Sequence, residues 1–114
     1  MKKKNKLVIG KFYLIYGGSP HPAQIFMIDT KHKTFLSIKF GTTQGKHMVR
    51  IHPIQKGRGN EQYAHKRPFE GVRSDYSDKE MLGFAVDDKD YQIIEEIKKR
   101  NPMKTSKAKK RYKK

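Results

Sequence analysis

The sequence predicts a mainly β (α+β) fold, because short runs of branched and aromatic residues alternate with turn-forming residues and one stretch alone has helical periodicity. The strand-like stretches are residues 7–16, 23–29, 34–40, 48–55 and 81–86, and the helix-like stretch is residues 88–100. Four or five short strands with one terminal helix are typical of a small antiparallel barrel, SH3-like or OB-like, or of a bent sheet.

The chain divides into three parts. A length of 114 residues predicts one domain, which we place at residues 7–101. Residues 1–6 form a basic arm with four lysines, and residues 102–114 form a lysine-rich tail that we expect to be disordered.

The first strand, residues 7–16, ends at GGSPHP, because two glycines and two prolines do not continue a ladder. Residues 34–40 alternate between apolar and polar, which predicts a core face and an opposite face that carries Lys39. The expected core residues of this strand are Leu36, Ile38 and Phe40. If residues 48–55 pair with this strand as a hairpin, then Lys39, Arg50 and His52 line one exposed surface.

The last third of the chain reads as a loop followed by a strand and a helix. Residues 56–77 contain few apolar side chains, several glycines and Pro68, so we expect one long loop. After the strand 81–86, Asp87 or Asp88 is a suitable N-cap for the helix. We expect Tyr91 and the isoleucines that follow it to share one helix face.

The formal net charge is +16, and the charge is unevenly distributed along the chain. Residues 7–60 carry eight basic side chains and only Asp29 as an acid, whereas residues 61–101 carry eight basic and ten acidic side chains. A strong positive field favours polyanions, so nucleic acid is the expected partner, with RNA favoured over DNA.

Several classes are not expected. No run of residues is apolar for long enough to span a membrane, and the apolar run after the first lysines is too short for a signal peptide. The chain has no cysteine, which fits a reducing compartment, so we expect a cytoplasmic protein. We expect no cofactor.

Cationic, hydroxyl and aromatic side chains cluster in the middle of the chain and in the tail. Phosphate contacts and stacking on aromatic rings are what single-stranded nucleic acid recognition uses. For Tyr63, stacking and anchoring of the loop are equally compatible with the sequence, and for Phe69 anchoring is favoured. The predicted nucleic-acid-binding residues are Lys39, Thr42, Thr43, Lys46, Arg50, His52, Lys56, Arg58, Tyr63, Lys66, Arg67, Arg73, Lys107, Lys109, Lys110 and Arg111.

The five histidines are His21, His32, His47, His52 and His65. None has a partner at HxxxH spacing, so no metal site is expected. If the protein is an enzyme, His21, His52 and His65 are the candidates for proton transfer in RNA cleavage, and Arg50 is the candidate for charge stabilisation. This reading requires His21 to come close to the other candidates.

The order of motifs resembles the MazF and PemK type of toxin endoribonucleases. GKFYLIY is similar to the family's first strand, GGSPHPAQIFMID to its loop and second strand, and MVRIHPIQ to a later strand that ends in a Pro-Ile-Thr-like motif. The resemblance covers roughly residues 10–100 and implies an SH3-like barrel with metal-independent endoribonuclease activity. His21 stands where the family has its catalytic arginine, and Gln55 stands where it has a threonine or serine.

Three functions are compatible with these features. The first is a small RNA-binding protein without catalytic activity. The second is a toxin-like endoribonuclease. The third is an interaction protein of a phage or other mobile element that inhibits a nucleoprotein machine.

Overall fold

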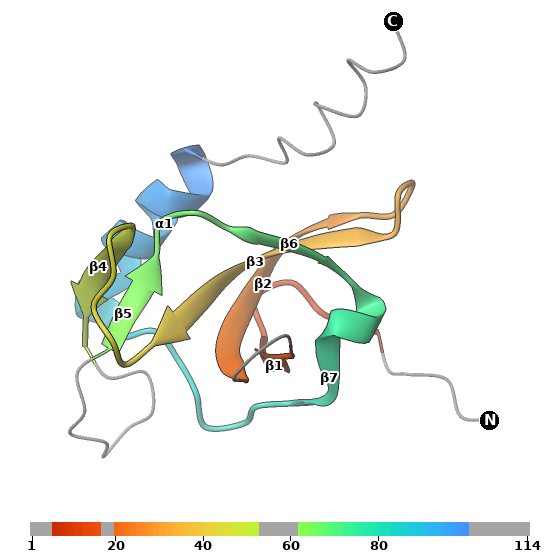
Figure 1. Cartoon of the computed structure of the whole chain (residues 1–114), viewed down its shortest axis with the longest axis horizontal. Helices are drawn as coiled ribbons and strands as arrows, with labels where there is room; N and C mark the ends of the chain where they lie inside the picture. The colour runs from red at the N-terminus through yellow and green to blue at the C-terminus, as the bar shows by residue number, and fades with distance from the viewer. Residues whose placement is uncertain (1–5, 17–19, 53–61, 101–114) are drawn as a thin grey trace, which may run out of the picture.

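A computed structural model describes residues 6–16, 20–52 and 62–100. Over these residues the chain forms a bent antiparallel sheet with one α-helix at its end (Figure 1). The strands are β1 (Phe12–Ile15), β2 (His21–Asp29), β3 (Thr34–Gly41), β4 (Met48–Ile51), β5 (Gln62–His65), β6 (Phe69–Val72) and β7 (Tyr76–Glu80). The helical elements are η1 (Arg73–Asp75), η2 (Asp88–Asp90) and α1 (Tyr91–Arg100).

The sheet is organised around β3. The strand order is β4-β5-β3-β2-β1-β7, and β6 pairs with β3 as well. One edge of β3 pairs with β2, whereas the other edge is shared by β6 at Thr34–Ser37 and by β5 at Phe40–Gly41. Within the described residues β4 and β7 lie at opposite ends of this order, so the sheet is open. The predicted mainly β fold with a C-terminal helix is confirmed, in its bent-sheet form.

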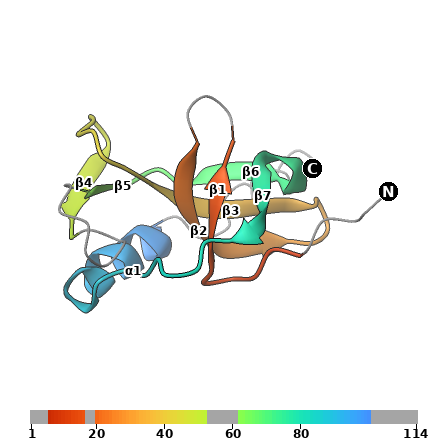
Figure 2. The ribbon, with the colours of Figure 1, turned by 90° about the horizontal axis from the view of Figure 1, so that it is seen from below.

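Both faces of the sheet are covered. On one face Leu36, Ile38 and Phe40 pack with Ile94 and Ile97 of α1. Figure 2 shows α1 beneath the β4–β5 end of the sheet. On the other face a second cluster is built around the fully buried Tyr76 and includes Tyr13, Ile15, Ala23 and Ile25.

The prediction of one long loop over residues 56–77 is wrong from residue 62 onward, because this part contains β5, β6 and the start of β7. These strands are short and polar in sequence, so they show no clear alternation. The close packing around Gly71 explains why the sequence has a glycine at this position. A Cβ atom there would lie 2.5 Å from the Phe69 ring and 2.7 Å from Asp75 Oδ2, so β6 needs glycine at this position.

The predicted strand over residues 81–86 is also wrong. The last strand is β7 at the edge of the sheet, whose residues after the buried Tyr76 are polar and largely exposed. Residues 82–83 form a turn in which Gly83 has φ of 87°, while Phe84 and Val86 pack against the helix-side core. The polar edge strand was missed because one edge of it faces solvent and its side chains need no apolar pattern.

Other boundaries differ by several residues. The first strand begins at Phe12 rather than residue 7, because Gly10 has φ of 91° and its N–H donates to Ile25 O at 2.7 Å. The strand predicted over residues 48–55 ends at Ile51, and residues 53–55 lie outside the described part. The Asp87 N-cap is confirmed, since its side chain accepts from Lys89 N. Tyr91 is 62% exposed, so its predicted place on the buried helix face is wrong.

Candidate nucleic-acid interface

The predicted hairpin between β3 and β4 does not form, because β5 lies between these strands. Gly41 and Arg50 are both register partners of Tyr63, and Met48 is the partner of His65. Side chains alternate along a strand, so the Arg50 and His65 positions share a sheet face. Lys39, two residues before Gly41 on β3, lies on the same face. Lys39 and Arg50 therefore lie on one sheet face, as predicted, but β5 lies between their strands.

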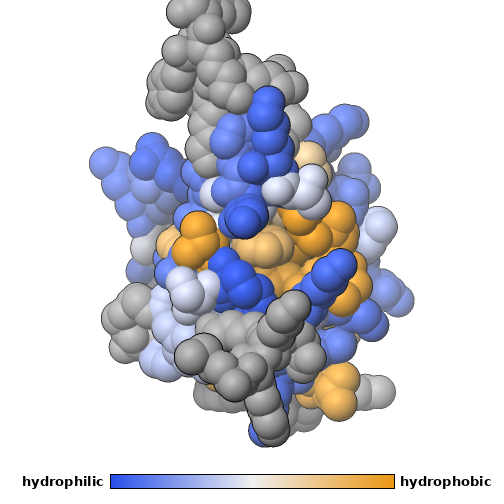
Figure 3. All heavy atoms as spheres, turned by 90° about the vertical axis from the view of Figure 1, so that its right-hand side faces the viewer, coloured by the Kyte–Doolittle hydropathy of each residue, from blue (hydrophilic) through white to orange (hydrophobic). Residues whose placement is uncertain are grey.

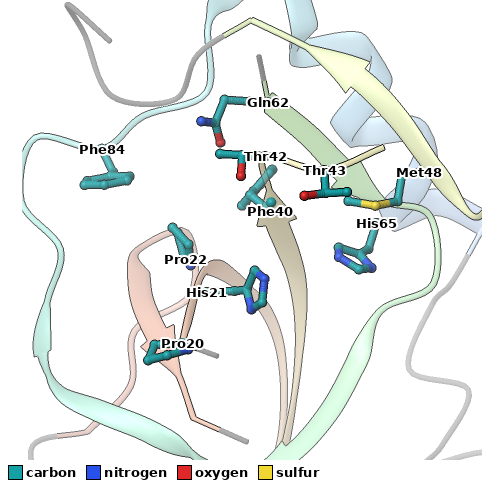
Figure 4. A pocket seen from close by; sticks show the side chains of 11 residues that line it. Pro20, His21, Pro22, Phe40, Thr42, Thr43, Met48, Gln62, His65 and Phe84 are labelled. Carbon is teal, nitrogen blue, oxygen red and sulfur yellow. The ribbon is translucent and has the colours of Figure 1, made fainter. Parts of the chain in front are cut away.

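His21 reaches this face from the start of β2. Its ring lies against Gly41, where a Cβ atom would be 3.5 Å from His21 Cδ2. His21 and His65 both line a pocket of about 530 Å³, together with Thr42 and Thr43. Figure 4 shows the two imidazole rings on the same side of the pocket, below Thr43. The pocket therefore brings together two of the three predicted catalytic histidines.

The rest of the pocket wall is largely apolar. Met48 and Phe84 contribute hydrophobic surface above the fully buried Phe40, and Gln62 contributes an amide (Figure 4). Among the described lining residues there is no carboxylate. Sequence reasoning missed Met48, Gln62 and Phe84, because they come from three separate segments and nothing local indicates that they meet.

Nearby charges affect the protonation of His65. Burial lowers the pKa of His65 below its usual value of 6.5, and the electrostatic influence of Lys39 and His21 lowers it further. The His65 ring is therefore neutral at pH 7. A neutral imidazole accepts a proton from a ligand or hydroxyl group, and an approaching phosphate favours its charged form.

Exposed cations lie next to two residues of the pocket lining, Met48 and His65, on the β4–β5 side. The backbone N–H of Lys66 donates to His47 O at 2.8 Å, which fixes the turn before β4 beside the residues after β5. This contact places Lys46 and His47 near Lys66 and Arg67, and all four side chains are exposed. The predicted residues Lys46, Lys66 and Arg67 thus form a cationic rim.

His52 has a structural partner at the contact between β4 and the helix. Its backbone N–H donates to Asp90 Oδ2 at 2.6 Å, and its ring Nδ1 lies 3.0 Å from the same oxygen. The Asp90 side chain is only 5% exposed. His52 is not among the described residues that line the pocket. The Asp90 carboxylate thus joins η2, directly before α1, to the residue that follows β4.

The aromatic residues expected to stack on bases are largely buried. Tyr63 is only 6% exposed, so anchoring is its role and the stacking alternative is wrong. Phe69 packs edge-on against Tyr76 with ring centroids 6.2 Å apart, which confirms its anchoring role. Lys39 Nζ lies 5.2 Å from the centroid of the Phe69 ring, so Phe69 also positions a cation of the interface.

Arg73 belongs to a different part of the molecule. It donates to Tyr76 O at 3.1 Å and forms an ion pair with Asp78 at 3.3 Å. Its grouping with the other predicted binding residues is therefore wrong. The remaining predicted residues lie outside the described part of the chain: Lys56, Arg58, Lys107, Lys109, Lys110 and Arg111.

Within residues 6–16, 20–52 and 62–100, no three His, Asp or Glu side chains gather closely enough to hold a metal ion. No helix in this described part is long and apolar enough to cross a membrane. The chain matches no protein-family model, and no curated protein or solved structure shows significant similarity to it. The resemblance to MazF and PemK type toxins remains an expectation from sequence motifs.

Proposed function

We propose that the protein binds single-stranded RNA on the sheet face that carries His21, Lys39, Arg50 and His65, which we call the His21–His65 face. The observation that carries this proposal is that His21 and His65 line one pocket whose described lining contains no carboxylate. Strand register puts Lys39 and Arg50 on the same sheet face. A phosphate chain that crosses this face meets both cations on the face that carries the pocket.

The pocket adds a place for one unpaired nucleotide. Its volume of about 530 Å³ admits a base and its ribose, with Met48 and Phe84 offering apolar surface to the base. The Gln62 amide has both a donor and an acceptor for a base edge. The hydroxyls of Thr42 and Thr43 also line the pocket and can donate to a phosphate or ribose oxygen. Bases paired in a duplex do not reach such a pocket, so single strands are favoured.

The overall charge supports RNA as the ligand. A net charge of +16 accelerates association with any polyanion and makes binding strongly salt-dependent. That field alone carries no sequence information, because phosphate contacts do not distinguish bases. Selectivity for single strands must therefore come from the pocket and the cations placed around it.

The test compares two double variants that remove the same charge. Lys39→Gln with Arg50→Gln changes the His21–His65 face, whereas Lys89→Gln with Lys99→Gln changes exposed cations on η2 and α1. Affinity for a fluorescent single-stranded RNA is measured by anisotropy at several salt concentrations. We expect the first variant to bind about tenfold more weakly. The slope of log K against log salt should become about 1.4 less negative, because each of the two lost phosphate contacts contributes about 0.7 for a single strand.

The matched variant controls for the general electrostatic field. It should keep its affinity within about twofold, because it removes charge without removing placed phosphate contacts. Equal losses in the two double variants would refute the His21–His65 face as the binding site. Equal affinity for duplex and single-stranded RNA would refute the role of the pocket.

The meeting of His21 and His65 favours a second candidate function, metal-independent RNA cleavage. One imidazole would take the proton of a ribose 2′-hydroxyl as its oxygen bonds to phosphorus. The bond from phosphorus to the 5′ oxygen would break as that oxygen takes a proton from the other imidazole. The products are a 2′,3′-cyclic phosphate and a 5′-hydroxyl, and Lys39 would offset charge on the phosphorane.

Cleavage is tested separately from binding. Labelled RNA is incubated with the protein in chelator, and the fragments are analysed for 2′,3′-cyclic phosphate ends. Enzyme activity predicts fragments that disappear in His21→Ala and in His65→Ala but persist in His47→Ala, which changes an exposed histidine of the rim. Intact RNA at high protein concentration would exclude cleavage and leave the binding proposal standing.

A further inference from the structure

A second hollow lies at the end of the sheet away from β4 and β5. The turn between β2 and β3, the β6–η1 connection and the segment before β1 enclose about 790 Å³. In Figure 1 this end contains η1 and the tip of the β2–β3 hairpin, while β4, β5 and α1 lie at the other end. We call this hollow the η1 groove. It shares no lining residue with the pocket of the His21–His65 face.

The floor of the η1 groove is apolar, mainly aliphatic, and partly open to solvent. Leu7, Ile28, Phe35 and Val72 line it, and Val72 is 45% exposed. Figure 3 shows apolar surface gathered among hydrophilic groups on this side of the molecule. Apolar surface of this kind, surrounded by polar groups, is typical of a contact site for another molecule.

The rim of the groove is positively charged. Lys6 and Lys33 are exposed at the rim, and Arg73 is held there by its ion pair with Asp78. Lys33 is fixed in the turn with φ of 58°. Both lysines line the groove, so their positive charge lies within reach of a ligand that enters.

The one carboxylate in the described lining is already engaged. Asp29 is buried, and its two oxygens accept from His32, one from the backbone N–H at 3.2 Å and the other at 2.7 Å from the ring Nδ1. It therefore adds little negative character to the groove surface. A ligand that complements the groove combines aliphatic side chains with negative charge.

We propose that the η1 groove docks an extended segment of a protein partner in which aliphatic residues alternate with aspartate or glutamate. In an extended chain alternate side chains point to opposite sides, so aliphatic groups enter the floor while carboxylates reach the lysines at the rim. The charge complementarity argues against a second copy of this chain, because each copy would bring the same cations to the contact. RNA fits less well, because base stacking uses exposed aromatic faces and this floor is mainly aliphatic.

The probe is a pool of fluorescein-labelled synthetic peptides about ten residues long, with Leu, Ile or Val alternating with Glu. Two matched pools replace Glu by Lys, or the aliphatic residues by Ser. Anisotropy with the full chain should show binding of the acidic aliphatic pool only. In ¹H–¹⁵N spectra the backbone signals of Ile28, Lys33 and Val72 should shift on titration.

Single substitutions locate the site. Val72→Glu and Lys33→Glu should each weaken binding of the acidic aliphatic pool at least tenfold, because each places a carboxylate in or beside the groove. Leu82→Glu and Lys99→Glu are the matched controls, since Leu82 is 80% exposed outside the groove and Lys99 is exposed on α1. Both controls should bind within about twofold of the unmodified protein.

Several outcomes would overturn the proposal. These are absence of binding, equal binding of the Ser-containing pool, or equal losses in the control variants. Self-association or binding to anionic lipid vesicles that Val72→Glu abolishes, without peptide binding, would assign the groove to another ligand. RNA affinity of the groove variants should stay unchanged apart from the small effect of net charge, so failure here is distinguishable from failure of the RNA proposal.

Discussion

Substitutions at the contact between His52 and Asp90 test whether His52 stabilises the fold or binds RNA. Asp90→Ala removes a buried carboxylate that accepts from the His52 backbone N–H at 2.6 Å and lies 3.0 Å from the His52 ring. His52→Ala removes only the ring contact and keeps the backbone hydrogen bond. The two substitutions therefore probe different parts of one connection between β4 and the helix.

The expected losses of stability follow from the exposed fractions of the Asp90 and His52 side chains. Hydrogen bonds to charged groups contribute about 1.5–3 kcal/mol each, and the Asp90 carboxylate is almost completely buried, so Asp90→Ala should lower the free energy of unfolding by about 3 kcal/mol. The His52 side chain is 49% exposed, which reduces the ring contribution to about 1 kcal/mol or less. The double variant should show a coupling energy of about 1 kcal/mol.

Urea unfolding of the two single variants and the double variant measures these free energies. RNA affinity is measured under conditions in which each variant is folded. We expect His52→Ala to keep its RNA affinity within about twofold, since the ring is held by Asp90 outside the described lining of the pocket. A large loss of RNA affinity in His52→Ala without a loss of stability, or no coupling to Asp90, would refute the structural role.

Three further predictions concern the sheet and its titrating groups. Burial raises the pKa of Tyr76 from 10.0 to about 12. The buried neutral side chain therefore contributes fully to the free energy of unfolding below pH 10, and about 3 kcal/mol of that free energy is lost as the pH rises toward 12. Urea unfolding at increasing pH should show a flatter profile for Tyr76→Phe, and the exposed Tyr91→Phe serves as control. Gly71→Ala should cost about 2 kcal/mol by thermal unfolding, because its Cβ would meet the Phe69 ring at 2.5 Å, and an unchanged Tm would contradict this packing. Because the pKa of His65 is lower in the folded than in the unfolded state, the unfolded state binds a proton more readily, and the free energy of unfolding falls as the pH drops below 6.5. His65→Gln should therefore lose less stability on acidification than the unmodified protein.

Local patterns were sufficient for the parts of the fold that depend on local physics. Alternation identified the core side of β3, and Leu36, Ile38 and Phe40 are buried together as expected. The Asp87 cap was predicted because capping uses neighbouring residues. The strands β5 and β6 have only four residues each and β7 is polar after Tyr76, so none of them shows the alternation that identifies β3.

The sequence by itself determined a mainly β chain with a terminal helix and a strongly cationic character, because composition, alternation and capping act over a few residues or over the whole chain. The tertiary structure decided which cations meet, since the insertion of β5 between β3 and β4 depends on pairing between distant segments. That pairing, with His21 lying against Gly41 of the neighbouring strand, brings His21 and His65 to one pocket. His52 is instead held by Asp90, which is 38 residues away in sequence. Such contacts follow from strand register and helix docking, and no local pattern encodes them.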